Sequence, residues 1–393
     1  MSRRRITFVV HDLAANPIVR AAALARAIER DCDVELIGFL HSGTDVYEPY
    51  RHLFDYRAMS VPRDTAAVLR AIPSLASRAT GDIVYACKPL VTSFGAALYA
   101  ARFAAHRPLL LDVEDDEWAT GRTGWGSFLW RDVMKGWRHA TAWKYTRALH
   151  AAVRCADAIT VSTRTLQRRY GGTVVRHGPA AEGYDPERIS PTERVARRRA
   201  WNVTDSTPVA LFAGVPQPHK GWPTLMNALR HPLAADWHLV LAGPDDHPDF
   251  AAAARILGSR CHVIGPQPHT SMPALLSAID AVPVPQLDVA FARSQLPAKL
   301  LEAMASMRAV IATTVGDLPE LLGHGSRGWL VPPGDSEALA AALHAIAARP
   351  HEAALRGRAA RDWYLAEASQ PAMRDRLLAI IDALEPAALV AHG

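Results

Sequence analysis

The chain of 393 residues lacks several features that would assign it to a specialised protein class. It has only 4 cysteines, none in a Cys-x-x-Cys pair, which argues against a disulfide scaffold or a zinc site. No apolar run approaches the roughly 20 residues that a bilayer-spanning helix needs. The loop at residues 214–221, which opens a helix after an apolar run, has neither the Walker spacing GxxxxGK[ST] nor the dinucleotide fingerprint GxGxxG. We therefore expect a soluble globular protein that is neither a nucleoside triphosphatase nor a dinucleotide-dependent enzyme.

The excess of positive charge is also small. There are 44 Lys and Arg against 39 Asp and Glu, a formal net charge of +5. This favours an anionic partner but does not distinguish nucleic acid, a phosphorylated metabolite or a lipid headgroup. The opening MSRRRITFVVHDL has an apolar run too short for a signal peptide and predicts a first strand instead, so we expect a cytoplasmic protein.

Short apolar runs alternate with helical patterns along the whole chain, and most lack polar alternation. This pattern is typical of buried parallel strands in strand-helix units, repeated here twice, and predicts an α/β protein with two Rossmann-like, doubly wound parallel sheets. The runs lie at residues 6–10, 34–40, 82–87, 108–113, 157–162, 209–214, 238–243, 261–265, 281–285 and 309–314.

A charged, proline-containing stretch at residues 180–208 separates the two sets of runs. It predicts an N-terminal domain at residues 1–190 and a C-terminal domain at residues 191–365. Residues 366–393 are predicted to be a helix that returns to the N-terminal domain. Open α/β sheets bind ligands at the carboxyl ends of their strands, so we expect the chemistry in a cleft that both domains face.

One candidate phosphate site follows the run at 209–214. The run ends at Gly214, and Lys220 and Gly221 open the next helix. Glycine lets the backbone approach a ligand, and a lysine beside the free amides of a helix start attracts phosphate oxygens. A solvated lysine at a helix start explains the same residues about equally well.

A second helix of the same half begins near Pro297 and carries Lys299 and Glu302. Proline suits the first turn of a helix, so the amides near Ala298 and Lys299 are free to meet an anion. An exposed ion pair three residues apart is the alternative. Because apolar residues surround Glu302, and an unpaired buried carboxylate is costly, we favour a ligand-binding role.

Four segments of the second half together resemble the GT-B-fold retaining glycosyltransferases of family 4: residues 214–221, 239–244, 296–322 and 328–335. The resemblance implies a GT-B fold, an N-terminal acceptor-binding domain and a C-terminal domain that binds a nucleotide-sugar. It implies that Lys220, helped by Lys299, binds the diphosphate, that Glu302 binds the ribose hydroxyls and that Gly265 lies near the base. The other implied donor-binding residues are Gly214, His219, Gly221, Gly243, Ser294, Leu296, Pro297 and Ala298.

The sequence departs from the family pattern at two positions. The first glutamate of the family's E-x7-E motif, which usually touches the transferred sugar, would fall on Ser294, so sugar contacts stay open. Val215 replaces a common arginine, so one cation for the phosphates is missing; Lys299 is its expected substitute and His219 a weaker one.

Acidic residues follow the predicted strand at 108–113, among them Asp115 and Asp116. Such a cluster can hold Mg²⁺ against a diphosphate, but the resembled family uses cationic side chains, so we expect no metal and no cofactor. Asp115 is predicted to act in catalysis, and Asp116, Asn16 and Lys88 to bind the acceptor. Helix capping is the alternative for some of these acids. An ordinary surface position is the alternative for Asn16, Lys88 and the nearby Arg20.

Residues 118–147 contain five of the 10 tryptophans, together with several Arg and Lys. A basic aromatic segment of this kind favours peripheral contact with an anionic membrane. A helix packed on its own domain is the alternative. Single-stranded nucleic acid also binds such residues, but no nucleic-acid motif accompanies them and we expect no nucleic-acid partner.

The residues and the resemblance together predict a retaining hexosyltransferase. A UDP- or GDP-linked sugar would be the donor, and a glycan or lipid-linked hydroxyl at the inner face of the membrane would be the acceptor. Lys220 and Lys299 would stabilise charge on the leaving phosphate, which would itself act as base. The alternatives are a catalytically silent nucleotide-sugar-binding partner, suggested by Ser294, or an epimerase or phosphorylase on the same fold.

Overall fold

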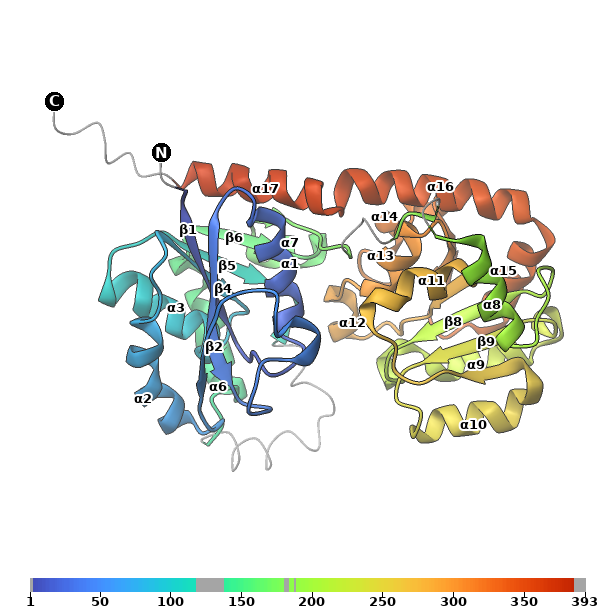
Figure 1. Cartoon of the computed structure of the whole chain (residues 1–393), viewed down its shortest axis with the longest axis horizontal. Coiled ribbons are helices and arrows are strands. Elements are labelled where there is room, and N and C mark those ends of the chain that lie inside the picture. Colours follow the sequence, from blue (N-terminus) through green and yellow to red (C-terminus); the bar gives the residue numbers. More distant parts are fainter. Residues whose placement is uncertain (1–2, 118–137, 180–183, 187–188, 385–393) are drawn as a thin grey trace. The chain divides into compact units, whose positions relative to one another are not determined.

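The computed structural model describes residues 3–117, 138–179, 184–186 and 189–384. The chain divides into two compact units (Figure 1). Unit 1 comprises Met1–His177 and Gln370–Gly393, and unit 2 comprises Gly178–Ser369. The domain limits predicted from the sequence were residues 190 and 365.

Unit 1 contains a parallel sheet of seven strands in the order β3-β2-β1-β4-β5-β6-β7. The strands are β1 (Arg5–Val10), β2 (Asp33–Leu40), β3 (Tyr56–Ser60), β4 (Ile83–Cys87), β5 (Leu109–Val113), β6 (Ala158–Val161) and β7 (Thr173–Val174). The strand order changes direction between β1 and β4, which pair in register from Ile6 opposite Ile83. Ligands of doubly wound sheets bind beyond such a switch point.

Helices cover both faces of this sheet, with α2 and α3 on one side and α1 on the other (Figure 1). The helices are α1 (Ile18–Ile28), α2 (Thr65–Ala76), α3 (Ala96–Leu98), α6 (Trp143–Ala151), α7 (Arg164–Tyr170) and α17 (Gln370–Ala383). Wider π-helical turns at Val91–Gly95 and Tyr99–Ala104 flank α3, and shorter 3₁₀ turns lie at Glu48–Tyr50 and Ala152–Cys155.

Unit 2 contains a six-stranded parallel sheet in the order β10-β9-β8-β11-β12-β13. The strands are β8 (Val209–Ala213), β9 (His238–Ala242), β10 (Cys261–Val263), β11 (Ala281–Val284), β12 (Ala309–Thr313) and β13 (Trp329–Val331). Here the switch point lies between β8 and β11.

The helices of unit 2 also cover both faces of its sheet. Hydrophobic residues of α9, α10 and α15 pack on one face, and those of α11, α13 and α16 on the other. The helices are α8 (Pro191–Ala200), α9 (Trp222–Arg230), α10 (Pro248–Leu257), α11 (Met272–Ser277), α12 (Ala290–Ser294), α13 (Ala298–Ala305), α14 (Leu318–Leu321), α15 (Ser336–Ala348) and α16 (Pro350–Glu367). Single 3₁₀ turns lie at Pro218–Lys220, Pro232–Ala234, Gly258–Arg260, His269–Ser271 and Gly323–Gly325.

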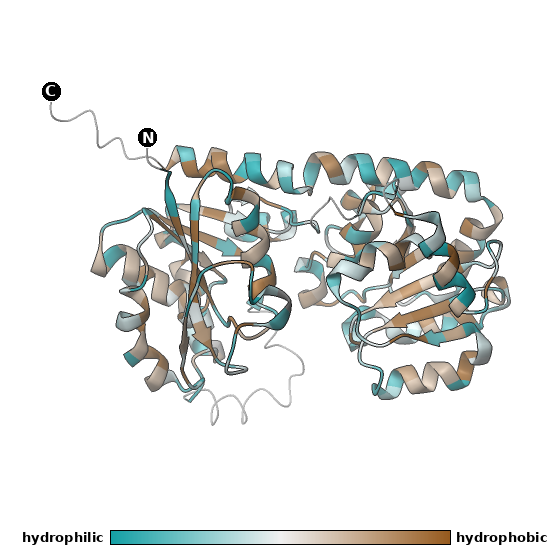
Figure 2. Cartoon of the chain, viewed as in Figure 1, coloured by the Kyte–Doolittle hydropathy of each residue, from teal (hydrophilic) through white to brown (hydrophobic). Residues whose placement is uncertain are grey.

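The predicted fold class is confirmed, and each predicted apolar run forms a strand. The strands form hydrophobic stripes between more polar helices (Figure 2). Strands β3, β7 and β13 were not predicted as strands. The three lie at sheet edges. β3 has a mixed sequence, and β7 and β13 are only two and three residues long.

Helix α17 belongs to unit 1, where it packs against α1. Met373, Leu377 and Ile381 recur every four residues and are at most 1% exposed, so one stripe of the helix is buried. At its edge, Arg374 forms a bidentate pair with Asp31, with N–O distances of 2.7 and 2.6 Å.

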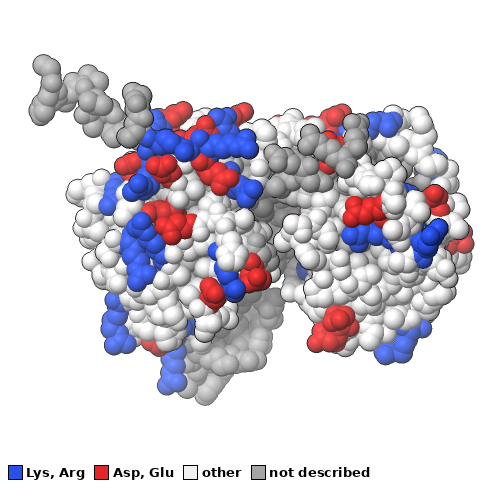
Figure 3. Space-filling model, in the orientation of Figure 1, with Lys and Arg blue, Asp and Glu red and all other residues white. Residues whose placement is uncertain are grey.

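Acidic and basic side chains lie close together over the face shown in Figure 3, in keeping with the small net charge. Among the described residues, no helix is long and apolar enough to span a bilayer.

Candidate active site

The loop between β8 and α9 is shaped by two glycines with positive φ. Gly214 has φ +100° and Gly221 has φ +68°, a left-handed conformation that side chains disfavour. A Cβ atom on Gly221 would lie only 1.7 Å from the carbonyl oxygen of Pro285. The start of α9 is therefore pressed against the segment after β11, and only glycine fits there.

Lys220 folds back over this loop. Its Nζ donates to the carbonyl of Val215 at 2.8 Å and lies 3.6 Å from where a Cβ of Gly214 would be. Burial lowers the pKa of Lys220 below its ordinary value. The lysine is therefore held at the switch point of the sheet, with no carboxylate within 4.0 Å among the described residues.

Helix α13 starts beside this loop. Pro297 is the N-cap residue of this helix, and no side chain caps the helix start. The backbone amide of Leu300 donates to the carbonyl of Pro297 at 3.0 Å. The amides of Ala298 and Lys299 precede that bond and are available to an anion.

The ammonium group of Lys299 lies 4.1 Å from the centre of the Phe212 ring. Its pKa is lowered to about 7, first by burial and then by the charge of Lys220, while Glu302 opposes the shift. The positive charge of Lys220 therefore acts on Lys299 from the neighbouring loop. The structure thus brings the two predicted lysines together.

Glu302 lies one turn further along α13, and burial raises its pKa to about 7. The Tyr184 hydroxyl, 3.5 Å from Glu302 Oε1, and the charge of Lys299 act in the opposite direction. The carboxyl group is thus largely removed from water, which makes a hydrogen-bonded ligand its best available compensation. Tyr184 was not predicted, since it lies in the stretch taken as a linker.

His219 belongs to the same group. Its pKa is lowered by burial and then by Lys220 and Lys299. The ring meets the edge of Phe291 at 5.3 Å, and the backbone carbonyl of His219 accepts from Leu287 N at 2.8 Å. A neutral imidazole therefore lies next to the lysines.

The loops after β9 and β10 contribute Gly243 and Gly265. Gly243 N donates to Gly265 O at 3.1 Å, and a Cβ on Gly243 would lie 2.9 Å from Gly214 O. The structure therefore gathers the three predicted glycine loops along one edge of the sheet. Asp245 lies beside Gly265, with Oδ2 3.8 Å from where a Cβ of that glycine would be.

The predicted site residues from Ser294 to Ala298, at the start of α13, differ in how far they are buried. Ser294 is only 2% exposed, and its hydroxyl donates to Phe291 O at 2.9 Å. Leu296 packs on the core, whereas Ala298 is exposed. The intervening Gln295 accepts a hydrogen bond from Gln286 at 3.3 Å. Neither glutamine was predicted, although Gln286 directly follows the predicted strand at 281–285.

In unit 1, Lys88 and Asp115 meet at the carboxyl edge of the sheet. Lys88 has φ +90°, and its Nζ lies 2.6 Å from Glu117, 3.1 Å from Asp115 and 3.6 Å from Glu114. These carboxylates raise the pKa of Lys88 despite its burial, and burial raises that of Glu114 to about 7. The acids are thus organised around a protein cation, and no cluster of His, Cys, Asp and Glu suited to a metal occurs among the described residues.

The other two predicted acceptor-binding residues, Asp116 and Asn16, contact other partners than Lys88. Asp116 pairs with Arg169 of α7. Asn16 is exposed in the turn before α1, where its carbonyl accepts from Val19 N at 3.0 Å.

Arg20 occupies neither a surface nor a ligand-facing position. It is 1% exposed and forms a bidentate pair with Asp112 at 2.6 and 2.7 Å. It also contacts Val175 O at 3.0 Å and His177 Nδ1 at 2.8 Å. The sequence interpretation of Arg20 as surface was therefore wrong, because its partners lie far away in the chain.

Residues 118–137 of the predicted membrane-binding segment lie outside the described residues. Of the remainder, Arg138 accepts a backbone hydrogen bond from Thr65 N at 2.9 Å, and α6 packs on unit 1.

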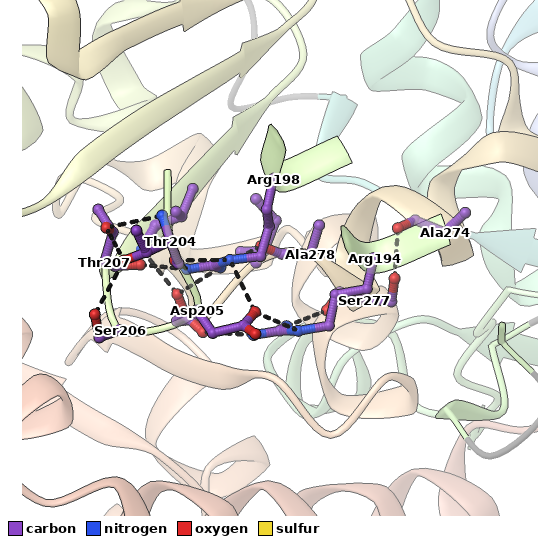
Figure 4. A network of polar contacts seen from close by, with 12 residues as sticks. Arg194, Arg198, Thr204, Asp205, Ser206, Thr207, Ala274, Ser277 and Ala278 are labelled. Atoms are coloured by element: carbon purple, nitrogen blue, oxygen red, sulfur yellow. Dashed lines mark hydrogen bonds and ion pairs between the residues drawn. The ribbon is translucent and has the colours of Figure 1, made fainter. Parts of the chain in front are cut away.

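A cavity of about 510 Å³ lies at the opposite edge of the unit 2 sheet, before β8 and β9. Trp237, Arg260 and His344 line it, and none of the predicted site residues does. Its rim includes the 204–207 loop, whose backbone is fixed by Arg198 through Thr204 O at 2.7 Å (Figure 4). Arg198 also donates to Ala278 O at 2.8 Å. The polar contacts of Arg198 at this edge of the sheet therefore hold the backbone in place.

Known proteins share both the sequence pattern and the fold. Residues 207–349 match the family described as Glycosyl transferases group 1. The D-inositol 3-phosphate glycosyltransferase of Corynebacterium glutamicum (strain R) is 31% identical over 208 residues, 48% of this chain and 48% of the relative. The C-terminal part of the chain is thus similar in sequence to group 1 glycosyltransferases. It spans about half the length of the curated relatives that it matches.

Two solved structures share the fold of this chain over nearly its whole length. A glycosyltransferase from Rickettsia africae has a TM-score of 0.73 at 17% identity, covering 98% of this chain and 99% of that one. Anabaena HepE in complex with UDP-glucose has a TM-score of 0.73 at 18% identity, covering 97% and 100%. At these identities the likeness shows the GT-B fold alone.

Proposed function

We propose that this chain transfers a hexosyl group from a nucleoside-diphosphate sugar to a hydroxyl acceptor with retention of configuration. The observation that carries the proposal is the pairing of Lys220 and Lys299, two partly buried lysines at the switch point of unit 2 without a carboxylate partner within 4.0 Å among the described residues. A diphosphate supplies the charge that this arrangement lacks.

In the proposed reaction, the bond between the anomeric carbon and the β-phosphate oxygen breaks and its electron pair stays on the phosphate. The acceptor hydroxyl forms the new bond on the same face of the sugar, and its proton passes to the leaving phosphate. Lys220, Lys299 and the amides at the start of α13 stabilise the developing negative charge. Glu302 is proposed to bind the ribose hydroxyls, and Asp115, paired with Lys88, is proposed to act in catalysis by stabilising positive charge on the sugar.

No metal takes part in this proposal, so activity should survive a chelator. The acceptor is proposed to be a glycan or lipid-linked intermediate. Residues 118–147 are proposed to contact an anionic membrane, on the strength of their composition alone. Unchanged pelleting with anionic vesicles after joint replacement of Trp130, Arg131, Lys135 and Trp137 would count against that contact.

The donor is tested by a thermal-shift screen with UDP, GDP, ADP and TDP, followed by sugar-release assays with the matching nucleotide-sugars. A ligand that binds only the folded state raises the unfolding temperature. The expected result is stabilisation by UDP or GDP and release of the sugar. HepE was crystallised with UDP-glucose, which makes UDP the first candidate. Binding without release or transfer would instead indicate a nucleotide-sugar-binding partner, and no binding would reject the proposal.

A further inference from the structure

Gln286 has a buried polar atom that the proposed chemistry has not yet used. The residue follows β11 by two positions and is 4% exposed. Its Nε2 donates to Gln295 Oε1 at 3.3 Å, but its Oε1 is buried without a hydrogen-bond partner among the described residues. Leaving a buried acceptor unsatisfied is costly, so such an atom calls for a donor that arrives with a ligand.

The backbone of Gln286 lies between the starts of α9 and α13. The preceding Pro285 carbonyl touches Gly221, and the following Leu287 amide binds the carbonyl of His219 at 2.8 Å. On the other side, Thr313 Oγ1 at the end of β12 donates to Gln286 O at 2.6 Å. The backbone around Gln286 is thus anchored on three sides, and the side chain reaches the segment that leads into α13 through Gln295.

The two amides together offer one acceptor and one donor. Gln286 Oε1 has no donor, and Gln295, which is partly exposed, retains its own NH₂ group. Reversing both amides exchanges the roles of the two residues but preserves one donor and one acceptor. A hydroxyl group donates one hydrogen bond and accepts others, so it complements this pair, whereas a phosphate oxygen only accepts.

We propose that Gln286 and Gln295 bind one hydroxyl of the transferred sugar and so help to select the donor. This inference rests on the proposed function. It gives the site a sugar contact where Ser294 replaces the family's glutamate and directs its hydroxyl to Phe291 O. Because the acceptor is buried, water competes little for it, and the contact discriminates between sugars with and without the hydroxyl.

The test compares UDP with UDP-glucose, and GDP with GDP-mannose, by calorimetry on the full chain. In Gln286→Leu, the affinity for the nucleotide-sugar should fall about tenfold while that for the free diphosphate changes less than about twofold. Gln295→Leu, at a partly exposed position, should show the same selective loss and serves if Gln286→Leu fails to fold. Gln167→Leu, which removes an amide bonded to Gly172 O in unit 1, is the matched control.

Deoxy analogues of the sugar identify the hydroxyl. The affinity of the wild type should be about tenfold lower for the analogue that lacks the bound hydroxyl. The affinity of Gln286→Leu should be the same for this analogue and for the complete nucleotide-sugar, because the substitution and the missing hydroxyl remove one interaction. Equal losses for sugar-nucleotide and diphosphate, or no loss in either variant, would overturn the inference while leaving the donor assignment intact. A wild type that binds none of the four compounds would reject the proposed function and this inference with it.

Discussion

Burial opposes the charge of both Arg20 in unit 1 and Lys299 in unit 2, but the two cations differ in what surrounds them. Arg20 has a bidentate carboxylate at 2.6 and 2.7 Å, a carbonyl and an imidazole, and Asp112 helps to raise its pKa. Lys299 has an aromatic ring at 4.1 Å and a second lysine nearby, and its pKa falls to about 7. Burial acts against the charge in both, so the difference lies in the partners.

This contrast separates structural from functional charge within one chain. A buried ion pair with all its hydrogen bonds in place holds elements together, as Arg20 joins α1 to the end of β5 and to Val175. Two partly buried lysines whose pKa values are lowered by burial have no such partner, and perturbed charges of this kind are typical of ligand-binding sites. Three predictions test this contrast.

The largest effect is expected where the satisfied pair is broken. Arg20→Ala leaves Asp112 buried, with the Thr160 hydroxyl at 2.6 Å as its remaining side-chain donor. The free energy of unfolding should fall by about 3–5 kcal/mol in a urea titration, because the carboxylate loses its counter-charge. Replacing both partners, in Arg20→Met with Asp112→Leu, should recover much of this loss. A single variant as stable as the wild type would contradict a structural role.

The next effect concerns catalysis. Lys220→Ala should lower kcat/KM by about 10²–10³, the loss typical of removing one stabilising donor from a developing anion. Its stability should match or exceed that of the wild type, because burial already disfavours the charged lysine. Arg260→Ala, at the cavity on the opposite edge, provides a comparison, since its guanidinium binds backbone carbonyls such as Trp237 O at 3.1 Å and its loss should affect stability instead. Steady-state kinetics and urea unfolding on both variants distinguish the two kinds of cation.

The smallest effect concerns protons. The pKa of Lys299 is about 7 in the fold, below its ordinary value of 10.5. Between these values the unfolded chain binds more protons, so the stability contributed by this group rises with pH across that window. A bound diphosphate should raise the pKa of Lys299 again, so UDP binding at about pH 8 should take up close to one proton.

Calorimetry in buffers of different ionisation enthalpy measures this uptake. Glu302, whose pKa is raised to about 7, has the opposite dependence: the fold binds more protons between 4.5 and about 7, and stability falls with rising pH there. Lys299→Met is the control for the assignment of the proton to Lys299. This variant should lose most of the proton uptake that accompanies UDP binding at pH 8. Unchanged uptake in that variant would place the proton elsewhere.

The sequence predicted the fold well because buried parallel strands have a simple apolar pattern. The runs at 209–214 and 281–285 became β8 and β11, and the switch point between them placed Lys220 and the segment beyond β11 at one edge. Edge strands such as β3 were missed because their pattern is mixed. The prediction that Lys220 and Lys299 lie together depended on two helix starts, each readable locally.

The partners of charged side chains were less predictable. Arg20 binds Asp112, 92 positions away, and nothing near either residue signals that pairing. Tyr184, which reaches Glu302, lies 118 positions from it. The role proposed for Gln286 also had no sequence signal, because it rests on a buried side-chain oxygen that accepts no hydrogen bond among the described residues. Contacts across a fold depend on the packing of whole elements, which local periodicity does not encode.

The position of α17 bears on how the chain folds as it is synthesised. Unit 2 is a single uninterrupted stretch of chain, whereas unit 1 is completed by Gln370–Ala383. The side of α1 that packs against α17 therefore remains uncovered on the ribosome until all of unit 2 has emerged. Nascent domains usually mature from the N-terminus; here the later-made unit is free to finish first, and the earlier one needs protection from aggregation while it waits.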